Sequence, residues 1–128
     1  MKSLKIGVIL PLSLLYFSIS INAQSESSLA RKKAALEKAE QIRKELIAGA
    51  DFATLAKEHS DDPGSAVYGG ELGFMGKGQL VPQYEKAALA LATGETSEPV
   101  KTEFGYHIIQ LLEIKEGRFN TRHILIKP

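Results

Sequence analysis

Two short apolar runs near the C-terminal end of the chain constrain its fold more than any other feature. Residues 106–112 and 121–126 are rich in β-branched and apolar side chains, as buried strands are. A charged, glycine-containing reversal at 115–118 separates them, so an antiparallel hairpin is their natural pairing. Each run contains one histidine, His107 or His123. If the hairpin brings the two histidines opposite each other, their rings can share one polar network in an apolar site, which has the character of a small-ligand pocket.

The segment ahead of the hairpin predicts helices and loops. Residues 29–48 contain no Gly or Pro and carry apolar residues at three- and four-residue steps. This pattern predicts a helix that Ser28 caps and Gly49 ends. Asp51 caps a second helix, Pro82 begins a third, and a glycine-rich loop with at most a short strand lies between these two. These helices and strands together predict an α+β domain, in which helices cover a small antiparallel sheet.

The first 23 residues differ from the rest of the chain. A short basic start is followed by the uncharged apolar run 6–21, and Ala23 then places a small residue before Gln24. This is the order of a secretory signal peptide, so we expect cleavage after Ala23, export to the periplasm or cell envelope, and a mature domain of residues 24–128. The alternative is a retained membrane anchor. The 16-residue run is shorter than the roughly 20 residues that a spanning helix needs, and Pro11 interrupts it, so no stable membrane insertion is expected after cleavage.

Composition and motifs exclude several classes of function. Without residues 1–23 the chain carries 14 basic and 15 acidic residues. It therefore lacks the excess of positive charge that is typical of nucleic-acid-binding domains. It has no cysteine, its three histidines lack metal-ligand spacing, and no serine stands in a nucleophile-elbow pattern. The glycines of 73–78 do not have the spacing of a phosphate-binding loop, and Gln79 follows Gly78 where such a loop has Lys and then Ser or Thr. Asp61–Asp62 precedes a Pro-Gly turn, where such side chains more often cap the backbone than act as an acid–base pair. No cofactor and no metal is expected.

Three stretches together resemble the parvulin family of peptidyl-prolyl cis-trans isomerases. They are residues 48–65, 69–82 and 94–109, and the likeness runs continuously from about residue 29 to 112. The resemblance implies a four-stranded antiparallel sheet flanked by helices, of the FKBP-like superfold. It also implies an exported bacterial foldase that isomerises X-Pro bonds in unfolded or proline-containing polypeptides, without covalent chemistry.

The same resemblance implies a site in which two histidines, an acid and a threonine hydroxyl border an apolar pocket for the proline ring. The implied catalytic residues are His107, His123, Asp62 and Thr102. The implied substrate-binding residues are Leu72, Leu80, Tyr84, Phe74 and Gln79. Leu80 stands where the family often has Met and Tyr84 where it usually has Phe, and both keep the size and apolar character of the wall.

The position of the first strand departs from the family. There a His-Ile-Leu strand precedes the long helix, whereas here residues 122–127 place that pattern at the C-terminus. Either the chain is circularly permuted and residues 122–128 complete its own sheet, or these residues open a second unit of a tandem protein. The expected state is a monomer or a strand-swapped dimer. A displaced strand also keeps two other hypotheses open: a holding chaperone that uses the same groove, and a fragment with no activity of its own.

Overall fold

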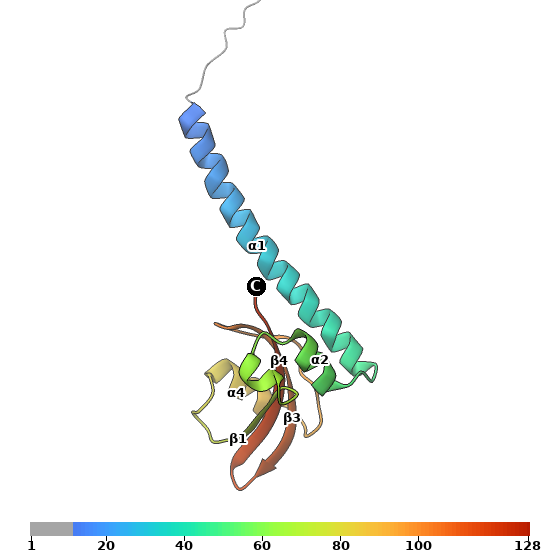
Figure 1. The fold of residues 1–128 in the computed structure, drawn as a ribbon. Helices are drawn as coiled ribbons and strands as arrows, with labels where there is room; N and C mark the ends of the chain where they lie inside the picture. Colours follow the sequence, from blue (N-terminus) through green and yellow to red (C-terminus); the bar gives the residue numbers. More distant parts are fainter. Residues whose placement is uncertain (1–11) are drawn as a thin grey trace, which may run out of the picture. The chain divides into compact units, whose positions relative to one another are not determined.

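The computed structural model describes residues 12–128, with the side chains of residues 24–128. Its helices are α1 (Leu12–Ile47), α2 (Phe52–His59), α3 (Pro63–Ala66) and α4 (Pro82–Leu89). Its strands are β1 (Glu71–Met75), β2 (Val100–Thr102), β3 (Gly105–Lys115) and β4 (Arg118–Ile126) (Figure 1). The chain divides into two compact units, the first ending at Arg31 and the second comprising Lys32–Pro128.

The described part of the first unit is the N-terminal portion of α1. The predicted helix start was wrong, because α1 begins at Leu12 and Ser28 lies inside the helix. No glycine or proline stands between Leu12 and Ile47, so nothing interrupts the backbone hydrogen bonds there. The predicted signal peptide begins in residues 1–11, which lie outside the described residues, and cleavage after Ala23 stays a prediction. Within residues 12–128, no helix is both long and apolar enough to cross a membrane.

The second unit is built on a four-stranded antiparallel sheet with the strand order β1-β4-β3-β2. The predicted hairpin is confirmed, since β3 pairs with β4 along its length. The chain reverses at Glu116 and Gly117, which have φ of 53° and 75°. Positive φ at both central residues is what a tight two-residue hairpin turn requires. Strand β4 therefore lies in the centre of the sheet, between β1 and β3.

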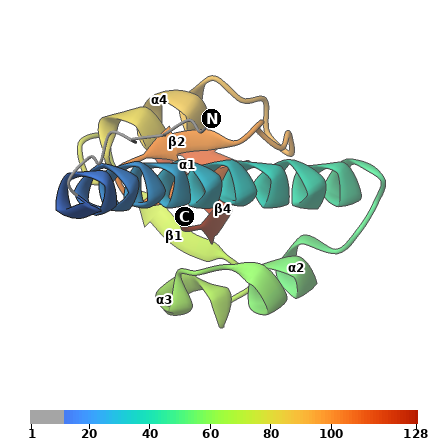
Figure 2. The ribbon, with the colours of Figure 1, turned by 90° about the horizontal axis from the view of Figure 1, so that it is seen from above.

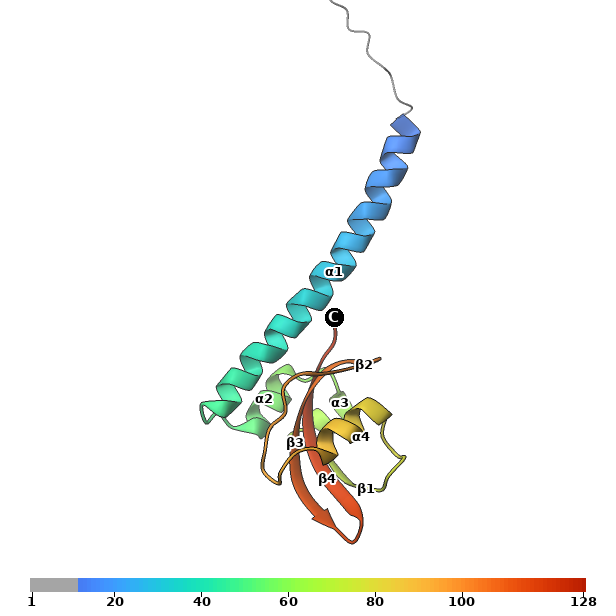
Figure 3. The same cartoon turned by 180° about the vertical axis from the view of Figure 1, so that it is seen from behind.

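Two apolar clusters cover the two faces of the sheet. On one face, α1 and α2 bury Ala39, Ile42 and Phe52 against Ile108 and Ile124 of the central strands. On the other face, α4 packs on alternate residues of the same strands, as the two-residue period of a strand requires. Figure 2 shows the sheet between α4 on one side and α2 and α3 on the other, and Figure 3 shows the same arrangement from behind. The predicted α+β class is thus confirmed, and the pocket described below opens on the α4 face.

Candidate functional site

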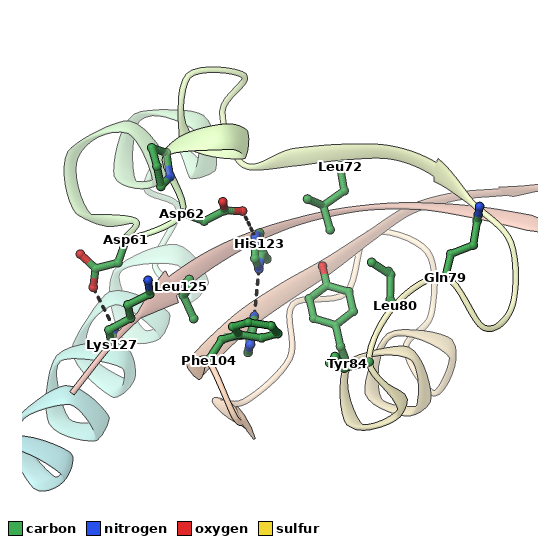
Figure 4. Close-up of a pocket in the computed structure, with 13 residues that line it drawn as sticks. Asp61, Asp62, Leu72, Gln79, Leu80, Tyr84, Phe104, His123, Leu125 and Lys127 are labelled. Carbon is green, nitrogen blue, oxygen red and sulfur yellow. Dashed lines mark hydrogen bonds and ion pairs between the residues drawn. The ribbon is translucent and has the colours of Figure 1, made fainter.

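A cavity of about 440 Å³ lies between α4, β1 and the central hairpin. Its apolar lining includes Leu72, Leu80, Val81, Tyr84, Phe104 and Leu125, and its polar lining includes the histidine pair (Figure 4). The cavity is thus an apolar pocket with a few placed polar groups, which is the usual character of a ligand site.

The two histidines come from neighbouring strands and share one face of the sheet. In the register, His107 of β3 lies opposite Leu125 and His123 of β4 lies opposite Ile109, so the two imidazoles are diagonal neighbours. Their ring centroids are 5.2 Å apart with an angle of 18° between the planes, and the two Nδ1 atoms are 3.0 Å apart. Both side chains are buried. The predicted polar pair inside the sheet is therefore present.

The histidine pair is the middle of a longer hydrogen-bonded chain. At one end, Thr102 Oγ1 lies 2.6 Å from His107 Nε2 and accepts the backbone N–H of Phe104. At the other end, His123 Nε2 lies 2.7 Å from Asp62 Oδ2, which also accepts a hydrogen bond from the Ser65 hydroxyl. The chain therefore runs from β2 through both central strands to the start of α3.

The charge state of Asp62 sets the direction of this chain. Burial raises the pKa of Asp62, but hydrogen bonds from Ser65 and His123 outweigh burial and hold that pKa below its usual value. The ionised carboxylate only accepts, so the Nε2 of His123 carries a hydrogen and its Nδ1, in the neutral ring, is an acceptor. It follows that His107 donates through Nδ1 and accepts at Nε2 from the Thr102 hydroxyl.

Both imidazoles are neutral in this arrangement. Burial, together with the neighbouring His123, lowers the pKa of His107 to about 4, and Asp62 only partly opposes this. Burial also lowers the pKa of His123, although the hydrogen bond and charge of Asp62 act in the opposite direction. Near neutral pH the histidine pair is therefore uncharged, its four ring nitrogens are hydrogen-bonded within the chain, and the charge beside it is that of the Asp62 carboxylate.

The segment before α3 is hydrogen-bonded to β4 and the residues that follow it, and these bonds hold Asp62 beside His123. The Asp61 N–H donates to the carbonyl of Leu125 at 2.7 Å, and the Leu125 N–H donates to Ser60 Oγ at 3.0 Å. The carboxylate of Asp61 accepts the Lys127 N–H at 2.8 Å. The capping expected for Asp61–Asp62 is not found at the turn: Asp61 accepts a backbone N–H of the C-terminal segment, and Asp62 makes no side-chain cap hydrogen bond to α3.

The ring of Tyr84 forms the wall of the pocket beside the histidines. Its centroid lies 5.3 Å from that of His107 and 5.5 Å from that of His123, with interplanar angles of 82° and 80°. Its hydroxyl lies 2.8 Å from Thr121 Oγ1. Where the family usually has Phe, this chain therefore has a phenol with a partner inside the sheet.

The structure brings together most of the residues that the resemblance implied. His107, His123, Asp62 and Thr102 form one chain, and Leu72, Leu80, Tyr84 and Gln79 line the cavity. The side-chain oxygen of Gln79 also accepts the N–H of Gly76.

Phe74, which the resemblance implied as a substrate-binding residue, does not line this cavity. Phe74 is partly exposed and borders a separate, shallow depression with Lys115 and Arg118. A register shift lies between Glu71 and Gly73, and Gly73 has φ of 81°. This bulge interrupts the alternation of β1, so Leu72 faces the pocket while Phe74 faces away from it.

Sequence reasoning missed several lining and supporting residues. They are Asp61, Pro63, Ser65, Val81, Phe104, Thr121, Leu125 and Lys127. Leu125 and Thr121 could have been found, because each stands two residues from His123 on a strand and so shares its face. No group of three or more side chains suited to hold a metal ion occurs among residues 12–128.

The fold and the site together define a peptidyl-prolyl isomerase domain of the parvulin class. The family described as "Rotamase: PPIC-type PPIASE domain" matches residues 19–113, and the chain belongs to this family. The matched range ends before β4, so the strand that carries His123 lies outside it.

The relatives are foldases and chaperones. The chain is 51% identical over 80 residues to the foldase protein PrsA of Geobacillus sp. (strain WCH70), a match that covers 62% of this chain and 29% of the relative. It is 46% identical over 76 residues to the chaperone SurA of Nitrosococcus oceani, covering 59% of this chain and 18% of the relative. The structure is similar to the crystal structure of the peptidylprolyl isomerase PrsA from Bacillus cereus, with a TM-score of 0.61 and 51% identity over 63% of this chain and 31% of that one. It is also similar to the crystal structure of PrsA from Bacillus subtilis, with a TM-score of 0.59 and 48% identity over 62% of this chain and 31% of that one. The chain thus spans less than a third of the length of these relatives.

Proposed function

We propose that this domain accelerates cis–trans exchange of X-Pro bonds in unfolded, exported polypeptides. The observation that carries the proposal is the hydrogen-bonded chain of Thr102, His107, His123 and Asp62 at the wall of an apolar pocket. The barrier to turning an X-Pro amide is about 18–20 kcal/mol, because rotation breaks amide resonance. No bond has to be made or cut, so the enzyme has only to bind the twisted amide more tightly than the planar one.

The pocket residues divide this task. Leu72, Leu80 and Tyr84 hold the prolyl ring and exclude water from it. The neutral histidine pair offers a fixed polar surface to the turning carbonyl, whose resonance with nitrogen is weakest midway through the rotation. Asp62 and Thr102 fix the tautomers at the two ends of the pair and take no part in covalent chemistry. Trapping a covalent adduct on Asp62 would contradict this division.

The activity is tested by the rate of exchange in a short Ala-Pro peptide, measured by NMR with residues 24–128 added. We expect acceleration by the wild-type domain and its loss in His107→Ala, with a cooperative melt, even at a lower Tm, showing that the variant is folded. A well-folded wild-type domain that leaves the exchange rate unchanged would refute the enzyme and favour a holding chaperone. A chain with no cooperative melt would instead indicate an inactive fragment.

The placement of β4 supports a second part of the proposal, that residues 122–128 take the place of the family's first strand in this chain's own sheet, the alternative being that they open a second unit. Strand β4 lies beside β3, and its His123 meets both His107 and Asp62. Strand β4 pairs with β3 of its own chain, so a monomer can complete the sheet, and the alternative is a strand-swapped dimer. A chain cut after Glu116 that folds and works as well as the intact one would contradict this role, and light scattering would identify a dimer.

We further propose that the chain is exported and cleaved after Ala23. The basic and apolar order of residues 1–23 supports this. The test is N-terminal sequencing of the protein recovered from outside the cytoplasm. A product that begins at Gln24 is expected, and one that retains Met1 would refute cleavage.

A further inference from the structure

A buried hydroxyl pair joins the pocket wall to the strand that carries His123. Tyr84 of α4 is 2% exposed and Thr121 of β4 is 1% exposed, and their hydroxyl oxygens lie 2.8 Å apart. An apolar ring would suffice as a wall for proline, so the phenol hydroxyl needs a separate explanation. A hydroxyl buried without a partner is unfavourable, so each group of this pair requires the other.

The pair is also placed where it can control the geometry of the site. Thr121 and His123 are two residues apart on β4 and share one face of the sheet. The ring of Tyr84 lies edge-on to both His107 and His123, and the same ring lines the pocket. The hydrogen bond from its far end to Thr121 therefore restrains the tilt of a ring that contacts both imidazoles.

The phenol remains protonated and can always take part in this bond. Burial raises the pKa of Tyr84 well above its usual value, and the hydrogen bond with Thr121 only partly offsets this. The bond therefore persists across the pH range in which the domain is folded. It acts as a fixed restraint, and titration does not switch it.

We propose that Thr121 is a positioning residue for the isomerase site, acting through the Tyr84 hydroxyl to hold the pocket wall against the histidine pair. This inference rests on the proposed function. Thr121 does not line the cavity and touches no substrate, so its loss leaves the apolar surface that binds proline in place. The effect of its loss falls on the alignment of the imidazoles with the turning amide, which influences kcat more than KM.

The test uses three single variants and one double variant in the Ala-Pro exchange assay. Thr121→Val removes the hydroxyl at nearly constant shape, and we expect kcat to fall about tenfold with KM within about twofold of the wild type. Thr121→Ser keeps the hydroxyl and is expected to restore most of the activity. Tyr84→Phe removes the partner, so adding Thr121→Val to it should cause little further loss, because the two groups act as a unit.

A second readout separates positioning from stability. The imidazole proton resonances of His107 and His123 should shift in Thr121→Val and stay close to wild type in Thr121→Ser, at a temperature where both variants are fully folded. A variant with a lower Tm but unchanged kcat and unchanged imidazole resonances would overturn the proposal and leave a structural role only. Independent, multiplicative losses from Thr121→Val and Tyr84→Phe would also overturn it.

The resonances further distinguish this inference from the proposed function. If the wild-type domain fails to accelerate exchange, the proposed function is refuted by that result alone. The resonances of the histidine pair then decide whether Thr121 positions it, and unchanged resonances in Thr121→Val refute the inference.

Discussion

Acidification from pH 7 to pH 5 should destabilise the domain through His107. The folded pKa of this histidine is about 4, below its ordinary value of 6.5, because the ring is buried. As the pH falls below 6.5, the unfolded chain therefore takes up a proton that the folded chain refuses. The stability that His107 contributes is present above its unfolded pKa and is lost progressively as the pH falls from 6.5 toward 4.

The size of this loss follows from the two pKa values. With about 6.5 in the unfolded chain and about 4 in the folded one, the unfolded state gains about 20-fold in relative population between pH 7 and pH 5. This factor corresponds to about 2 kcal/mol, a large share of the 5–15 kcal/mol typical of a native domain. The pKa of His123 is also lowered, so its protonation adds to the loss in the same direction. The lowered pKa of Asp62 acts only at more acid pH, below this window.

Urea unfolding followed by circular dichroism at pH 7 and pH 5 measures the effect. The wild type should lose about 2 kcal/mol or more between these pH values, and His107→Gln should lose distinctly less, although its stability at pH 7 is lower. His59→Gln is the matched control, because it removes a histidine that lies outside the pocket. Equal wild-type stability at both pH values, or a loss of the same size in His107→Gln, would refute the reasoning.

Three further variants probe other parts of the structure. Asp62→Asn allows position 62 to donate to His123 and so to reverse the direction of the hydrogen-bonded chain. The kcat in the peptide-exchange assay should fall about tenfold or more while the melt stays cooperative. Retention of full kcat would contradict the direction assigned to the chain. Gly70→Ala should destabilise the domain by about 2–4 kcal/mol in urea melts, because φ is 92° there and a Cβ would meet the backbone carbonyl of His123. Phe74→Ser should change neither kcat nor stability by more than about 0.5 kcal/mol, because Phe74 lies outside the pocket, and a fall in substrate affinity would reinstate it as a binding residue.

Features that depend on local pattern were predictable from the sequence. The hairpin and its buried histidines follow from two apolar runs and a glycine turn, since both strands and their connection lie within about 20 residues. The cap at Asp51 was equally local, and its side chain accepts from the N–H of Thr54. Local pattern could not predict which residues form the site, because residues as distant in the sequence as Asp62 and His123 meet only in the folded chain. The family resemblance supplied these.

Features that depend on backbone irregularity or on contacts across elements were not predictable. A bulge at Gly73 reversed the side on which Phe74 lies, and no alternation rule anticipates a bulge. The partnership of Tyr84 with Thr121 requires the packing of α4 on β4, which the sequence does not specify by spacing. The start of α1 was misplaced because Ser28 is a good cap by type, whereas nothing in the preceding residues breaks the helix.

The position of β4 has a consequence for the kinetics of folding. In the strand order that the resemblance implies for the family, the two histidine strands lie at opposite ends of the domain, so their pairing closes a loop of nearly the whole chain. Here a two-residue turn joins β3 to β4, and His107 and His123 are 16 residues apart. Short loops close at little entropic cost, and hairpins form in about 1–10 μs. The centre of the sheet, with its histidine pair, can therefore form early. Strand β1 and the segment that contains Asp61 and Asp62 then dock onto it. Folding should accordingly be faster than in a domain with the usual strand order.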